Sequence, residues 1–170
     1  MKMKKILLGV MLTGSLLVAN TFAQIGLGYS KGDSSDNFIT AFGSIKVLSN
    51  IDLRLEYTKN VSENPEFSKE DISRYGLFAT YTLPLAANFS ITPKIGLAKT
   101  DGSFTFNDTF KRISDSSTEF TYGIEANYQM NDNISLFVGY TDYGNKLKLK
   151  ELDSSQLDTK NYTFGIKIDI

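Results

Sequence analysis

Apolar side chains recur at every second residue along the chain from Gln24 onward. This is the period at which successive side chains of a β-strand point to one face. Residues 51–57 (IDLRLEY) are the clearest case, with apolar and charged positions in strict alternation. The pattern predicts strands at residues 24–31, 37–47, 51–61, 71–83, 89–99, 117–130, 134–145 and 159–170, and no segment among them has a helical period.

The connections between these predicted strands alternate between short and long. Residues 48–50, 84–88 and 131–133 form the short ones, and residues 62–70, 100–116 and 146–158 form the long ones; only 32–36 is short where a long one is due. Strands of about 9–11 residues cross a bilayer when they are tilted. Short turns at one end and long loops at the other are typical of outer-membrane barrels. The sequence therefore predicts an all-β fold, a closed eight-stranded antiparallel transmembrane β-barrel with short periplasmic turns and longer extracellular loops.

The three short turns determine which residues share a face. Residues directly opposite each other across a hairpin point to the same side of a sheet. With Val47 opposite Ile51, Leu83 opposite Phe89 and Met130 opposite Ile134, the turns predict three inward neighbour pairs: Lys46 with Asp52, Phe78 with Lys94, and Asn127 with Phe137. All three turns agree with a single outer face that is apolar and carries no charge.

The opposite face of the predicted strands carries the charged residues. These are Lys46, Asp52, Arg54, Glu56, Arg74, Lys94, Glu125, Lys167 and Asp169. A soluble ligand-carrying barrel has the reverse polarity, and an apolar exterior of this extent requires lipid. The inner charges are close to balanced in sign, as charges removed from water must be. Because Arg54 lies two residues from Glu56 on the same face, we expect these two side chains to be partners.

Two interpretations of the charged interior remain open. The first is a salt-bridged filling of a narrow barrel, which an eight-stranded interior normally has. The inward residues Phe38, Phe42, Phe78 and Phe137 add volume and favour this interpretation. A filled lumen predicts a structural or cell-surface interaction role of the adhesion type. The alternative is a narrow porin-like channel for small solutes or ions.

The longest predicted loop, residues 100–116, contains a group of phenylalanines. Phe104, Phe106 and Phe110 form a candidate adhesive tip. The alternative is that these residues pack on strands that continue above the membrane. A further irregularity is Pro93, which faces lipid in the fifth predicted strand. A closed barrel has no free edge for a residue without an N–H, so Pro93 predicts either a missing ladder hydrogen bond or a bulge.

The tyrosines sort by face and by end of the predicted strands. All of them except Tyr143 have outward parity. With the N-terminus in the periplasm, the residues near the outer interface are Tyr29, Tyr57, Tyr75, Tyr122, Tyr140 and Tyr162, and those near the periplasmic interface are Tyr81, Phe89 and Tyr128. These positions match the aromatic girdles that flank the apolar band of a membrane barrel.

The first 23 residues have the features of a secretory signal peptide. Lysines at positions 2, 4 and 5 precede an apolar segment at residues 6–18, and small residues follow at Thr21 and Ala23. Cleavage is expected between Ala23 and Gln24, which divides the chain into a cleaved signal peptide, 1–23, and a barrel domain, 24–170. The alternative is an uncleaved anchor, but the apolar segment is shorter than the ~20 residues that span a membrane.

The composition excludes several classes of function. The 170-residue chain has no Cys and no His, and its formal net charge is −1. The missing Cys excludes a disulfide scaffold and a thiolate metal site, and the missing His removes the usual general base and the commonest metal ligand. We therefore expect no enzymatic activity, no cofactor, and no catalytic or metal site; a lipid-modifying barrel enzyme is the least favoured alternative. The small net charge gives no indication of nucleic-acid binding.

The C-terminal strand carries a family resemblance. Thr163, Gly165, Ile168 and Ile170 match the spacing of the assembly signal of small outer-membrane barrels, a polar residue, a Gly two later, and apolar residues three and five after the Gly. Residues 24–170 resemble the small outer-membrane β-barrel family that includes the OmpA barrel domain, OmpX, Ail and the opacity proteins. The family usually ends in Phe, whereas this chain ends in Ile170.

The resemblance implies an OmpA-like, porin-family protein in the outer membrane of a Gram-negative bacterium. Both termini would then lie in the periplasm, and a monomer is expected. The implied partners are outer-membrane lipid, lipopolysaccharide and the barrel-assembly machinery. A ligand on a host or neighbouring cell is the candidate partner for the surface role.

Overall fold

The computed structural model describes residues 23–32, 36–62, 67–106, 112–144 and 160–170, and its strands belong to one antiparallel sheet. The strands are Ala23–Gly32 (β1), Asn37–Leu48 (β2), Ile51–Asn60 (β3), Phe67–Tyr81 (β4), Leu83–Ala86 (β5), Phe89–Phe106 (β6), Arg112–Gln129 (β7), Ile134–Asp142 (β8) and Lys160–Asp169 (β9). Within the described residues, no helix is long and apolar enough to cross a membrane.

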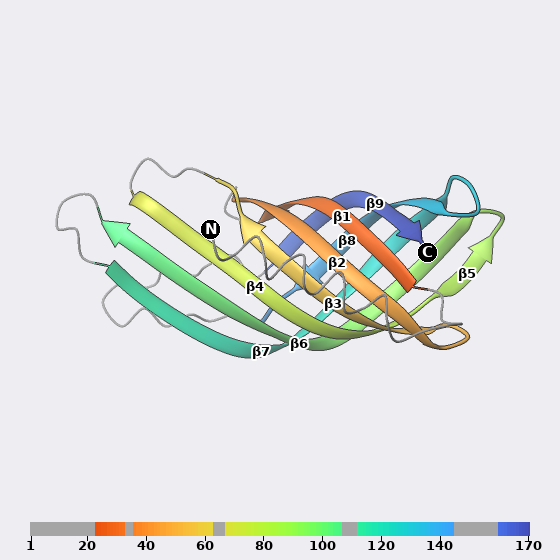
Figure 1. Ribbon diagram of the computed structural model, residues 1–170, viewed down its shortest axis with the longest axis horizontal. Coiled ribbons are helices and arrows are strands. Elements are labelled where there is room, and N and C mark those ends of the chain that lie inside the picture. Colours follow the sequence, from red (N-terminus) through yellow and green to blue (C-terminus); the bar gives the residue numbers. More distant parts are fainter. Residues whose placement is uncertain (1–22, 33–35, 63–66, 107–111, 145–159) are drawn as a thin grey trace.

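The sheet closes into a barrel, which Figure 1 shows from the side. The first strand pairs with the last, β1 with β9, and β4 pairs directly with β6. The short β5 continues β4 after a break at Thr82, so the nine labelled strands form eight strands of the barrel wall. The predicted closed antiparallel barrel of eight strands is confirmed. Closure leaves no open strand edge in the wall. An open edge would be unfavourable there, because lipid offers no hydrogen-bond partners for its backbone amides.

Side chains alternate between an exposed and a buried face along the long strands. Leu27, Leu55 and Leu97 point outward, and they are 56%, 56% and 57% exposed. Arg54 and Phe78 point inward, and they are 1% and 0% exposed. This is the reverse of a soluble protein, and it is favourable only in lipid, because apolar surface is driven out of water.

The first and third short turns give the predicted inward neighbours. Lys46 lies opposite Asp52, and Asn127 lies opposite Phe137. After Lys46 the register shifts, and Val47 has no partner in β3. The shift changes the pairing at the turn itself but leaves the inward side chains of both strands in place.

The second short turn is tighter than predicted. β5 carries the pairing with β6 into the predicted loop, so only Ala87 and Asn88 remain in the turn, and Ala87 has a φ of 48°. The predicted neighbour pair Phe78 and Lys94 is therefore wrong in register, since Phe78 lies opposite Gly96. The displacement is two residues, and because the side-chain period of a strand is also two, every side chain keeps its predicted face.

Three strands are longer than predicted and continue beyond the barrel wall. The outer ends of β4, β6 and β7 lie at Phe67, Phe106 and Arg112, where the sequence predicts ends at 71, 99 and 117. These outer parts pair with one another, and Figure 1 shows them as an extension at the left of the molecule. The predicted loops 62–70 and 100–116 are therefore partly strand. Their polar composition is that of strands paired outside lipid.

Pro93 accounts for the break between β4 and β5. Its strand pairs with β7 without a register shift, whereas pairing on the other side ends at Thr80 and resumes at Leu83. Proline has no N–H to donate, so the missing hydrogen bond is the correct one of the two expectations. On the other side of the strand, Asn50 holds the residue at the break: its carbonyl accepts from the N–H of Thr82 at 2.8 Å, and its side-chain amide donates to the Thr82 carbonyl at 3.0 Å.

Candidate functional site

The candidate site is the charged interior of the barrel, with Glu125 at its centre. The carboxylate of Glu125 accepts a hydrogen bond from Arg54 and another, at 2.6 Å, from Lys167. The ammonium group of Lys94 lies 3.8 Å from the same carboxylate. These side chains are at most 4% exposed. Their attraction therefore operates in a medium of low dielectric, where it is stronger than in water.

A second carboxylate, Glu56, extends this network. Lys94 donates to it at 2.8 Å, and the hydroxyl of Tyr143 donates to its other oxygen, also at 2.8 Å. The expected partnership of Arg54 with Glu56 is wrong, because Arg54 reaches across the lumen to Glu125. Residues two apart on a strand are separated by about 6.6 Å. An eight-stranded lumen is narrow enough for a long side chain to meet the opposite wall instead.

Each of the buried cations in the described interior also lies over an inward aromatic ring. The distances from cation to ring centroid are 4.1 Å for Arg54 over Phe42, 4.8 Å for Lys94 over Phe78, 5.0 Å for Lys167 over Phe137, and 4.6 Å for Arg74 over Phe38. Such contacts contribute roughly 0.5–2 kcal/mol, more where water is excluded. The inward phenylalanines thus fill volume and also stabilise cations that outnumber the buried carboxylates.

Glycines on the inner face make room for these rings. A Cβ atom at Gly26 would lie 2.1 Å from the ring of Phe42, and one at Gly76 would lie 2.3 Å from the ring of Phe78. At Gly165 it would lie 2.6 Å from a third ring. Sequence reasoning missed this role and counted only Gly165, as part of the assembly signal. The available signal was the inward parity of these glycines beside inward phenylalanines.

A belt of hydroxyl groups lies beside the network on β9, β1, β2 and β3. The hydroxyl of Ser30 is 2.7 Å from that of Thr163 and 3.0 Å from that of Thr40, which is 2.9 Å from Thr58. Thr58 lies 3.3 Å from the hydroxyl of Tyr143. The belt is thereby continuous with the charged network, and its members satisfy one another across four strands.

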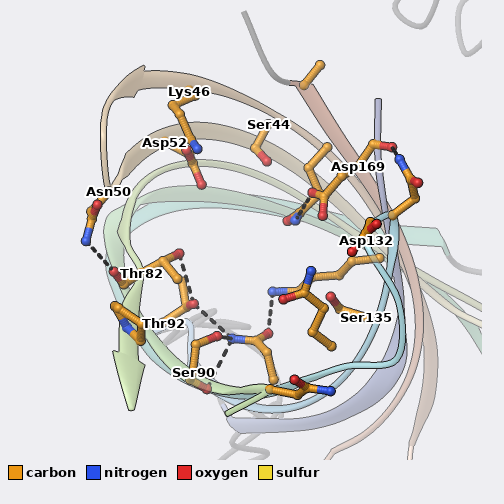
Figure 2. Close-up of a pocket in the computed structure, with 18 of the residues that line it drawn as sticks. Ser44, Lys46, Asn50, Asp52, Thr82, Ser90, Thr92, Asp132, Ser135 and Asp169 are labelled. Atoms are coloured by element: carbon orange, nitrogen blue, oxygen red, sulfur yellow. Dashed lines mark hydrogen bonds between the residues drawn. The ribbon is translucent and has the colours of Figure 1, made fainter. Parts of the chain in front are cut away.

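At the short-turn end the lumen opens into a vestibule of about 490 Å³, shown in Figure 2. Most of its lining residues are polar and come from the strand ends and turns, including Ser44, Lys46, Asp52, Ser90, Asn127 and Asp169. Arg54 and Lys167 also line it. The charged network therefore forms the floor of the vestibule.

The predicted lumen charges fall into two groups in the structure. The network holds Arg54, Glu56, Lys94, Glu125 and Lys167, and Arg74 joins it by lying 4.7 Å from the ring of Tyr143 while donating to Asn161 at 3.2 Å. The vestibule holds Lys46, Asp52 and Asp169, where Asp169 accepts from Gln24 at 2.8 Å. In the part of the chain that the structure describes, no three acidic side chains are grouped closely enough to hold a metal ion.

The aromatic residues assigned to the girdles lie on the outer face, and three pairs of them are in ring contact. The centroid distances are 5.0 Å for Tyr57 with Tyr75, 5.5 Å for Tyr140 with Tyr162, and 4.9 Å for Phe89 with Tyr128. The others, Tyr29, Tyr81 and Tyr122, are 53%, 43% and 49% exposed. Each contact joins neighbouring strands, so the rings form bands across the wall.

The residues of the predicted assembly signal divide between the two faces of β9. Thr163 and Gly165 point inward, and Ile168 and Ile170 point outward with exposures of 40% and 67%. The N–H of Ile170 donates to the carbonyl of Ala23 at 2.7 Å. The last residue of the chain therefore takes part in the seam that closes the barrel.

The sequence also matches a defined protein family. The profile of the family described as outer membrane protein beta-barrel domain matches residues 7–168. The chain belongs to this family of outer membrane beta-barrel domains. No curated protein matches it in sequence.

Solved structures share the fold of this outer membrane beta-barrel domain. The N-terminal barrel domain of OprF from Pseudomonas aeruginosa superposes with a TM-score of 0.68 at 11% identity, over 88% of this chain and 97% of that one. Ail, the attachment invasion locus protein of Yersinia pestis, superposes with a TM-score of 0.54 at 13% identity, over 88% of this chain and 97% of that one. Neisserial surface protein A superposes with a TM-score of 0.56 at 11% identity, over 88% of this chain and 94% of that one. At sequence identities this low, the superpositions show only that the fold is shared. The family places the protein in the outer membrane of Gram-negative bacteria.

Proposed function

We propose that this outer membrane beta-barrel domain is a structural or cell-surface interaction protein whose lumen is closed to solutes. The observation that carries the proposal is the cross-lumen network, in which cations from β3, β6 and β9 converge on Glu125. Inward phenylalanines occupy the space beside them. An eight-stranded barrel has little more interior than its side chains fill, which supports a plug rather than a pore.

The proposed orientation places both termini and the vestibule in the periplasm. Gln24 lies opposite Asp169 at the short-turn end, and bacterial barrels carry their short turns on the periplasmic side. At the other end, lysines lie on the outer face near the tyrosines, at positions 31, 59, 99 and 160. Basic side chains there can reach the phosphates of lipopolysaccharide. A signal peptide at 1–23, of which only Ala23 is described, and assembly as a monomer by the barrel-assembly machinery belong to the same proposal.

The proposed interaction platform is the extension formed by the outer parts of β4, β6 and β7. The pairing of β3 with β4 reaches only Ser73. Residues 67–72 of β4 therefore form a strand edge that no strand within the described residues covers. Such an edge offers backbone donors and acceptors to an added strand from another protein. A cell-surface ligand could bind there by extending the sheet.

Two of the three candidate adhesive phenylalanines, Phe104 and Phe106, belong to this extension. The backbone of Phe104 and Phe106 lies in β6, whereas their side chains and the whole of Phe110 lie outside the described residues. Ail is named as an attachment invasion locus protein, but at 13% identity it shares only the fold. The surface role proposed for this chain therefore rests on the extension itself.

Shortening the extension tests the surface role. Gly102 and Asp115 lie opposite each other, so an Asn-Gly turn can replace residues 103–114 without disturbing the wall. The shortened barrel should keep its heat-modifiable migration on gels, while cells that display it should lose attachment to epithelial monolayers and matrix-coated surfaces. A deletion of equal length within 146–158 is the control. Attachment that survives the shortening, or that never exceeds that of cells without the protein, would contradict the proposal.

A narrow channel is the second candidate, and the vestibule is the observation that favours it. The vestibule opens onto a floor that includes Arg54 and Lys167. A channel would require these side chains to leave Glu125. An enzymatic role has the least support, since the chain has no His.

A further inference from the structure

We infer that the vestibule is a binding site for a zwitterion, a free amino acid or a short peptide with free termini. The site lies at the short-turn end of the barrel, away from the extension of β4, β6 and β7. The lining of the vestibule supports this site independently of the proposed surface role.

The floor of the vestibule contains two buried hydrogen-bonding groups with no hydrogen-bond partner among the described residues. They are the hydroxyl of Ser44 and the Nε–H of Arg54, on residues 5% and 1% exposed. Ser44 and Arg54 lie opposite each other in the pairing of β2 with β3, and Figure 2 shows Ser44 directed into the opening. A buried polar group left without a partner is unfavourable. Two adjacent donors of this kind suit the two oxygens of a carboxylate.

Carboxylates lie on both sides of this floor. Asp52 is two residues before Arg54 on β3, and Asp169 lies opposite Gln24, which in turn lies opposite Ser44. Both aspartates are partly exposed, and Figure 2 shows them at the margin of the opening. An ammonium group placed above the floor would therefore meet two acids, with which it forms charge-assisted hydrogen bonds.

The balance of charge in the lining favours a ligand that carries both signs. The basic lining residues are Lys46, Arg54 and Lys167, and the acidic ones are Asp52, Asp132 and Asp169. A simple anion or a simple cation would be repelled by one of these sets, whereas a zwitterion can place each charge beside its opposite. The volume of about 490 Å³ falls within the ~300–1,000 Å³ of small-molecule sites. Water is the competing occupant.

Isothermal titration of the purified barrel in detergent distinguishes these occupants. The probes are trialanine with free termini, N-acetyl-trialanine and trialanine amide, with inorganic phosphate and glucose as an anion and a neutral polar solute. Trialanine should bind saturably at one site. Each capped peptide should bind at least roughly tenfold more weakly, because one charge-assisted interaction is lost.

Matched variants locate the binding. Ser44→Ala and Asp52→Asn should each weaken trialanine binding by roughly three- to tenfold. Ser73→Ala and Asp101→Asn make the same changes on the outer face and should leave binding unchanged; heat-modifiable migration shows that each variant is folded. The inference is overturned by absence of saturable binding, by equal binding of capped and free peptides, by phosphate or glucose binding as tightly as trialanine, or by unchanged affinity in both vestibule variants.

Discussion

Replacing Glu125 by glutamine should destabilise the barrel more than removing an exposed charge does. The side chain keeps its size and an acceptor oxygen, but the charge that faces Arg54, Lys94 and Lys167 is lost. Of the two carboxylates buried in the described interior, only Glu56 remains, against cations that were already in excess. The variant therefore leaves desolvated positive charge without its main counter-charge.

The expected size of the effect follows from two magnitudes. Removing one partner of a buried ion pair typically costs about 3–5 kcal/mol. One hydrogen bond retained by the glutamine amide offsets about 1 kcal/mol of that. We therefore expect the free energy of unfolding to fall by about 3 kcal/mol, which raises the ratio of unfolded to folded protein more than a hundredfold, at about 1.4 kcal/mol for each factor of ten.

Urea unfolding in lipid vesicles, followed by gel migration and tyrosine fluorescence, measures this change; the chain has no Trp. The control is Asp101→Asn, which removes a 2.9 Å ion pair with Lys99 whose members are 40% and 52% exposed. Exposed pairs contribute at most about 1 kcal/mol. If Glu125→Gln costs no more than Asp101→Asn, the buried network does not organise the lumen and the reasoning fails.

Four further substitutions, one of them a control, test the wall of the barrel by the same unfolding assay. Gly96→Ala should be strongly destabilising, because the added Cβ would lie 1.9 Å from the carbonyl oxygen of Leu77. Gly43→Ala is the control and should be neutral, because the space around Gly43 is open. Equal losses of stability in the two variants would contradict this reasoning. Pro93→Val restores an N–H at the break between β4 and β5 and should add about 0.5–1.5 kcal/mol, so a lower urea midpoint would count against the account of that break. Leu55→Arg puts a charge on the lipid face and should cost about 2–4 kcal/mol, and a loss well below that range would place residue 55 outside the membrane.

The barrel wall was predictable because the free energy that decides whether a side chain faces lipid or lumen is larger than that of any one cross-strand pair. A mid-membrane Arg or Lys on the lipid face costs about 2–4 kcal/mol, whereas a cross-strand pair contributes only about 0.2–1 kcal/mol. The alternation at 51–57 therefore determines which side chains enter the lumen. The position of Lys46 directly opposite Asp52 was predicted from the same alternation and from an odd turn length, and the structure has this pairing.

The contacts inside the lumen were not predictable in this way. Parity places Arg54, Glu56 and Glu125 on the inner face, but it carries no information on which strands meet across the lumen, so Arg54 received the wrong partner. The residue opposite Phe78 is set by the length of the turn at Ala87. Ala87 has a positive φ, which alanine rarely adopts, so the residue type gave no sign of this tight turn. The extension of β4, β6 and β7 was not predicted, because its polar strands lack the alternation of apolar and polar residues that marks lipid-facing strands.

Single-channel recording of the purified protein in planar bilayers tests the filled lumen most directly. With Glu125 holding cations from three strands across the lumen, the wild-type barrel should give no stepwise current in symmetric salt at either polarity. Reproducible unitary steps in the wild type, with a size that changes in Glu125→Gln, would contradict the closed lumen and establish the channel.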